Sequence, residues 1–155
     1  MMLLRVLAIL LVFASPVWAV CDMPGNVIAL RGELLALSNA ERASHGLPAL
    51  RMDARLTEAA QTQACRMADR GRLSHRGSWF AGLGRRLRRE DYAYATAVEN
   101  TGMGHRDAPQ IIRGWMDSPE HRVNMLNPAV RDAGYGVARA GDGQLHWSMI
   151  AAAER

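Results

Sequence analysis

The stretch "WMDSPEHRVNMLNP", residues 115–128, joins the expected end of one helix to the start of another. Ser118 is a favourable N-cap, and Pro119 at the first helical position already has a helical φ. Glu120 in the first turn complements the positive end of the helix dipole. The pattern therefore predicts that a short new helical turn, which contains His121, begins at Ser118, separate from the helix before it.

Helical periodicity extends outward from this stretch. Apolar residues recur at helical spacing over 27–43 and 53–70, and a third helix is expected over 108–117. Asp53 offers an N-cap for the second helix, whose alanine-rich face lets another layer approach closely. Asn124 is expected to satisfy backbone groups where the chain bends toward "NP".

Strand patterns separate and follow the helices. "YATAVEN", residues 94–100, suits a short strand, and 132–140 and 144–151 flank the turn "GDG" as a hairpin. Helices followed by short strands predict an α+β domain, with helices packed on an antiparallel sheet of about three strands.

The first nineteen residues resemble a secretory signal peptide. They contain an early Arg5, a short apolar run and a small residue at Ala19, and the run is too short for a membrane span. We expect 1–19 to be removed and 20–155 to form a single domain with no stable membrane span. Secretion to the periplasm or the extracellular space of a bacterium is the predicted location.

Two cysteines, Cys21 and Cys65, remain after this segment. In an oxidising compartment a pair of cysteines favours one disulfide, which would tie the N-terminus to the second helix. Two free buried thiols are the alternative.

The chain is mildly basic, with a net charge of +4, and all nineteen basic residues are arginines. The run "GRRLRRE", residues 84–90, concentrates four of them, but no aromatic residues interleave with it. A solvated helix face is the commoner role of such a run, so no nucleic-acid partner is predicted. The all-arginine, alanine-rich composition is typical of a bacterial genome with high GC content.

Common catalytic signatures are absent from the sequence. There is no HExxH, G-x-S-x-G or paired CxxC motif. Any metal or catalytic site must therefore be assembled from distant segments.

Five short motifs occur in a characteristic order: "LSH", "VEN", "WMDSPEHRVNMLNP", "GYGVA" and "HWSMI". In this order they resemble the CAP superfamily of cysteine-rich secretory proteins, antigen 5 and pathogenesis-related proteins, in its short bacterial form. The resemblance covers about residues 27–151. It implies an α-β-α sandwich with a cleft that holds histidines and acidic residues.

The resemblance also implies which residues form the site. His75 in "LSH", Glu99 in "VEN" and His121 in "SPEHR" match the family's cleft residues. The family's second glutamate corresponds to Ser118 here, which departs from the pattern, and Glu120 is a further candidate ligand. Two imidazoles and a carboxylate could hold zinc or another divalent metal, or act without metal in proton transfer. A polar cluster that only fixes helix-to-sheet packing is the alternative.

The family's members are associated with lipid or sterol binding, with envelope biology and in some cases with proteolysis. We therefore expect a binding module for a lipid, sterol, glycan or envelope component. A hydrolase, metal-assisted or of the serine type, is the second hypothesis, and a structural or adhesive module is the third. Catalytic turnover is not predicted by the residues themselves.

Overall fold

The computed structural model describes residues 21–74 and 82–155, so the expected signal peptide lies outside the described residues. The described ranges contain five helices and four strands. Along the chain these are α1 (Val27–Ser44), β1 (Arg51–Met52), α2 (Ala54–Arg70), α3 (Leu83–Arg89), β2 (Tyr94–Met103), α4 (Ala108–Asp117), α5 (Pro119–Met125), β3 (Asp132–Arg139) and β4 (Leu145–Glu154). The predicted α+β class is confirmed, with four strands where about three were expected.

The strands are ordered β1-β3-β4-β2 in one mixed sheet. β4 pairs antiparallel with β3, as the hairpin pattern predicts, and also antiparallel with β2, whereas β1 pairs parallel with β3. β1 was not predicted, because a strand of two residues is too short to show an alternation of apolar and polar side chains. β2 lies at the edge of the sheet opposite β1.

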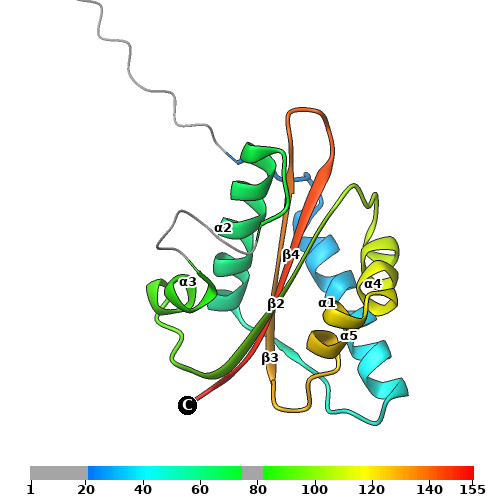
Figure 1. Cartoon of the computed structure of the whole chain (residues 1–155), viewed down its shortest axis with the longest axis vertical. Coiled ribbons are helices and arrows are strands. Elements are labelled where there is room, and N and C mark those ends of the chain that lie inside the picture. Colours follow the sequence, from blue (N-terminus) through cyan, green and yellow to red (C-terminus); the bar gives the residue numbers. More distant parts are fainter. Residues whose placement is uncertain (1–20, 75–81) are drawn as a thin grey trace, which may run out of the picture.

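Helices cover both faces of the sheet (Figure 1). α2 and α3 lie against one face, which we call the α2 face, and α1, α4 and α5 lie against the other, which we call the α4 face. Successive strand residues point to opposite faces. Glu99 and Ser148 therefore point to the α2 face, and Asn100 and Met149, which oppose each other, point to the α4 face.

α2 packs directly on β3 and β4. It begins at Asp53, whose carboxylate accepts hydrogen bonds from the backbone amides of Arg55 (2.8 Å) and Leu56 (3.2 Å), so the predicted N-cap is confirmed. A Cβ on Gly136 would lie 2.3 Å from the carbonyl oxygen of Ala60. The predicted close approach of the alanine face is thus matched by glycine on the strand.

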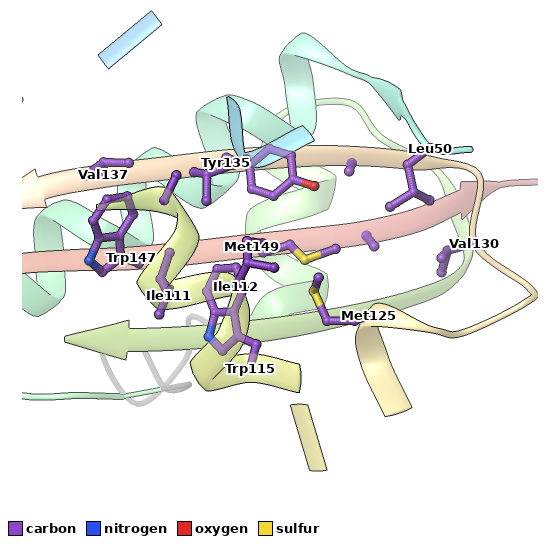
Figure 2. Packing of buried hydrophobic residues seen from close by; sticks show 14 residues of the cluster. Leu50, Ile111, Ile112, Trp115, Met125, Val130, Tyr135, Val137, Trp147 and Met149 are labelled. Carbon is purple, nitrogen blue, oxygen red and sulfur yellow. The ribbon is translucent and has the colours of Figure 1, made fainter. Parts of the chain in front are cut away.

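The α4 face carries the larger apolar core. Figure 2 shows side chains of α4 and α5 over those of the sheet, and the buried aromatic and aliphatic residues of this cluster include Ile111, Ile112, Trp115, Met125, Tyr135, Val137, Trp147 and Met149. Burying side chains of this size contributes about 1.5–3 kcal/mol each. This face therefore supplies most of the apolar stabilisation.

Two long-range connections complete the fold. Cys21 and Cys65 form the predicted disulfide, with a Cα–Cα distance of 5.4 Å, which ties the N-terminal segment to α2. The fully buried Arg42 of α1 donates hydrogen bonds to the carbonyl oxygens of Met125 (3.0 Å) and Asn127 (2.9 Å). Arg42 thereby fixes the end of α5 against α1. No helix in the described ranges combines the length and the apolarity that crossing a bilayer requires.

Candidate functional site

Glu99 lies in the middle of the edge strand β2 and points to the α2 face. Its carboxylate forms an ion pair with the guanidinium of Arg86 on α3, and the two side chains are 4% and 3% exposed. α3 forms because Leu83 and Leu87, one turn apart, pack against the small cluster around Ile150. The chain therefore places a buried charge pair beside the edge strand of the sheet, where that strand is itself buried.

α5 brings His121 to the same edge. Asn100 of β2 donates a hydrogen bond to the carbonyl oxygen of His121 (2.9 Å), and Asn124 donates to the side-chain oxygen of Asn100 (2.9 Å) and to the carbonyl oxygen of Glu99 (3.3 Å). Asn124 does satisfy a backbone carbonyl, but that of Glu99 in β2 and not one at the bend toward "NP", where it was expected. These three bonds hold α5 against β2 on the α4 face, so His121 lies at the same edge strand as Glu99, whose carboxylate points to the opposite, α2 face. His121 is half-buried.

The N-terminus of α5 differs in one respect from the prediction. Pro119 is in the first turn, and Glu120 lies there as well, as expected. The side chain of Ser118, however, makes no capping hydrogen bond, so that part of the prediction is wrong. Ser118 has an extended backbone with ψ at 117°, and it both ends α4 and begins α5. Because Ser118 is both the C-cap of α4 and the N-cap of α5, only its backbone, and not its side chain, begins α5.

The two further candidate ligands lie on the outside of this junction. Ser118 is half-buried, and Glu120 is exposed. Adjacent residues on a helix project about 100° apart, so Glu120 and His121 do not share a direction.

A metal site is not complete in the described residues. Within residues 21–74 and 82–155, no three side chains of His, Cys, Asp or Glu come together as a metal-binding group. His75, the third predicted ligand, lies outside the described residues. Glu99 and His121 alone do not fit zinc, because a cation there would compete with the Arg86 guanidinium for the same carboxylate. No catalytic step through a metal is therefore derived.

Two residues at this edge strand, Arg86 and Asn100, were not predicted from the sequence. Arg86 sits beside Leu87 in a run of arginines, and nothing in that run distinguishes the buried one from its exposed neighbours. Asn100 is the last letter of "VEN", and strand alternation places it on the α4 face, opposite Glu99, but no local pattern indicates its hydrogen bond to the backbone of α5. We call Arg86, Glu99, Asn100, His121 and Asn124 the edge site.

Another histidine, His146 of β4, lies on the α2 face and is 1% exposed. Its Nδ1 and the hydroxyl of Ser148, two residues along the strand, have no hydrogen-bond partner in the part of the chain that the structure describes. Burial lowers the pKa of His146, and the distant carboxylate of Asp142 opposes this only in part. The α2 face thus carries buried polar groups besides the Arg86–Glu99 pair.

Solved structures share this architecture. An extracellular protein of Bacillus anthracis that contains an SCP domain is 27% identical, with a TM-score of 0.74 over 82% of this chain and 41% of its own. An outer surface protein of Borrelia burgdorferi has a TM-score of 0.72 over 79% of this chain and 90% of its own, at 16% identity. The second likeness shows the fold alone.

Sequence comparison agrees with the structural likeness. The protein YkwD of Bacillus subtilis is 30% identical over 118 residues, which cover 76% of this chain and 46% of YkwD. The chain thus spans less than half the length of that relative. The profile of the family described as "CAP: Cysteine-rich secretory protein family" matches residues 35–150. The chain therefore belongs to the CAP family of cysteine-rich secretory proteins.

Proposed function

We propose that this CAP-domain protein is a secreted binding module whose edge site holds a polar group of a lipid, sterol, glycan or other envelope component. The observation that carries the proposal is the buried Arg86–Glu99 pair beside the edge strand β2. Secretion is supported by the signal-like residues 1–19 and by the disulfide between Cys21 and Cys65.

Stability alone is a weak reason for this pair. Taking two charges out of water costs several kcal/mol per ion, and apolar residues of similar volume are often as stabilising or more so. The charges of this pair, although almost completely buried, lie beside an edge strand and contribute to the electrostatic field that a polar ligand at this edge would meet. A binding role therefore accounts for Arg86 and Glu99 better than a packing role does.

The surrounding hydrogen bonds keep this site in one geometry. Asn100 and Asn124 bond to each other and to the backbone of β2 and α5, so neither helix nor strand can shift independently. A rigid framework reduces the entropy lost when a ligand binds. Guanidinium, amide and imidazole groups together suit the hydroxyl or phosphate oxygens of a sugar or a lipid headgroup.

The alternatives to this proposal are a metal site and a hydrolytic site, and the experiment below distinguishes them. Zinc binding would require His75 together with Glu99 and His121. Hydrolysis would require a nucleophile and an oriented base, and no such base bonds to the Ser118 side chain in the described residues.

The test is thermal unfolding of the exported, disulfide-bonded protein with three separate probes. These are zinc chloride, a soluble short-chain phosphatidylglycerol and a chitin oligosaccharide. A ligand that binds the native state raises the melting temperature by mass action. His121→Ala removes a side chain of the edge site, and His45→Ala at the exposed end of α1 is the matched control.

The proposal is supported if the lipid or the sugar raises the melting temperature of the wild type and of His45→Ala but not of His121→Ala. A rise with zinc alone, lost in His121→Ala, would replace the proposal by a metal site and justify a search for hydrolysis. If no probe raises the melting temperature, or all raise it equally in both variants, the edge site is not the binding site.

A further inference from the structure

Arginines lie in the second half of α2 and in α3, two segments on the face of the sheet away from α4 and α5 (Figure 1). Residues 66–74 and 82–90 together contain seven arginines and two acidic residues, a net charge of +5. The whole chain has a net charge of +4, so the rest of it is close to neutral. The positive charge of this protein is therefore concentrated in two segments on the same face of the sheet, and Arg66 lies close enough to Arg86, Arg89 and Arg70 to be affected by their charges.

One of these arginines, Arg86, is neutralised inside the fold by Glu99. Five others form no salt bridge with a carboxylate among the described residues. All five are exposed or half-buried. We call them the arginine surface, and they are Arg66, Arg70, Arg72, Arg88 and Arg89.

Helix capping explains only part of this arrangement. Arg70 and Arg89 lie in the last turns of α2 and α3, where a cation is stabilised by the helix dipole. Arg66 lies one turn earlier, and its Nη1 is buried without an acceptor in the described ranges. Burial, and then the nearby charges of Arg86, Arg89 and Arg70, lower the pKa of Arg66. The fold thus brings like charges together although their repulsion destabilises it.

An exposed apolar side chain accompanies the charges. Leu73 is 48% exposed and directly follows Arg72 at the end of α2. The long stems of arginine are themselves apolar, so these side chains can rest at an interface between water and lipid while their charged ends reach phosphates. Neither segment of this surface, 66–74 or 82–90, contains an aromatic residue on which a nucleic-acid base could stack.

We propose that the arginine surface docks this protein on an anionic lipid bilayer. Guanidinium groups bind lipid phosphates with two parallel hydrogen bonds, and Leu73 inserts at the headgroup boundary. This inference goes beyond the proposed function, because docking requires no ligand at the edge site. It does place the edge site close to the membrane, since Arg86 belongs to the same helix, α3, as Arg88 and Arg89.

The experiment measures cosedimentation of the protein, as the cell exports it, with two kinds of vesicle. One contains phosphatidylcholine with about one third phosphatidylglycerol, and the other contains phosphatidylcholine alone. Arg88→Glu with Arg89→Glu reverses two charges of the arginine surface. Arg106→Glu with Arg113→Glu makes the same change at exposed positions by α4, on the other side of the sheet. Thermal unfolding checks that each variant is folded.

The wild type and the α4 control are expected to bind the anionic vesicles, and salt should weaken that binding. The α3 variant should bind about 30-fold more weakly or worse, because each basic residue near an anionic surface contributes about one kcal/mol. If the α3 variant does not fold, Arg70→Glu with Arg72→Glu, at the end of α2, replaces it and should show the same loss.

Equal binding by the α3 variant and the α4 control would overturn the proposal, as would binding that ignores lipid charge. Absence of vesicle binding by the wild type, together with oligonucleotide binding that the α3 variant loses, would assign the surface to nucleic acid instead. The edge-site probes are soluble, so vesicle binding can succeed or fail independently of the proposed function.

Discussion

The two faces of the sheet are covered by different kinds of side chain. The α4 face is a continuous apolar layer in which Trp115, Trp147 and Tyr135 are almost completely buried. On the α2 face two smaller apolar clusters, one around Ile150 and one of alanines beside the disulfide, are accompanied by buried polar residues. These polar residues include Gln63, Glu99, Thr101, His146 and Ser148.

The two faces therefore contribute differently to stability and to the placement of polar groups. The α4 face buries large side chains, and their burial supplies stability. The α2 face packs helix backbone against strand glycines, which leaves less apolar area to bury and more room for polar side chains at the free edge. Chemistry and charge are accordingly found at β2 and α3, where the apolar layer is thinnest.

Trp147→Ala on the α4 face should have the largest effect. The indole is fully buried and its Nε1 donates to the carbonyl oxygen of His105 (3.0 Å), so we expect a loss of about 4 kcal/mol in the free energy of unfolding. Urea denaturation measures it. Ser148→Ala, the next residue, which points to the α2 face, is the matched control and should cost nearly nothing, because its hydroxyl has no partner in the described ranges.

A comparable loss in both variants would mean that the two faces contribute equally to stability. The conclusion that the α4 face contributes more to stability than the α2 face would then be wrong.

Breaking the ion pair of the α2 face should have the next largest effect. Arg86→Met leaves Glu99 buried without this partner, and we expect a loss of about 3 kcal/mol in the free energy of unfolding. The double variant Arg86→Met with Glu99→Leu should recover most of that loss, since two apolar residues can occupy the same space. Denaturation of all four proteins in the cycle gives the coupling energy, and an unrecovered double variant would contradict this view of the pair.

Gly136→Ala tests the close packing of α2 on the strand. Its new Cβ would meet the backbone of Ala60 and Gln61, which cannot move as a flexible side chain could, so we expect a loss of about 2 kcal/mol. Gly32→Ala in the middle of α1 is the control. Nothing lies near its Cβ position, and alanine should stabilise that helix by about 0.5–1 kcal/mol. Melting temperatures that shift in the same direction for both variants would argue against backbone contact at Gly136.

The smallest effect is the pH dependence of stability from His146. Burial lowers its pKa below the ordinary value of 6.5, so the unfolded state binds the proton more readily than the folded state. The stability is complete above the ordinary pKa and declines as pH falls through the lower pKa of the folded protein. A single proton limits the slope to about 1.4 kcal/mol per pH unit.

His146→Gln should flatten this decline, whereas His45→Gln, at an exposed position on α1, should leave it unchanged. Urea midpoints measured from pH 7 to pH 5 provide the readout. An identical decline in both variants would assign the pH dependence to other groups.

The sequence by itself determined those helices and strands that are specified by patterns of neighbouring residues along the chain. Helical periodicity, the N-cap at Asp53 and the glycine-bearing turn before β4 depend on neighbours along the chain, so α1, α2, α4 and the hairpin could be predicted. The disulfide could be predicted too, because Cys21 and Cys65 are the only two cysteines. The order of the motifs identified the family before any contact was known.

Which side chains of these elements contact one another was decided only by the tertiary structure. Arg86 is buried against Glu99, and Asn100 joins β2 to α5, because strands and helices far apart in the sequence meet at one edge of the sheet. The charge of a residue is local, but its burial and its partners are long-range. The sequence by itself therefore determined the fold class and the composition of the arginine run. Which arginine lies inside, and which remain outside as a charged surface, was decided by the packing of α3 on the sheet.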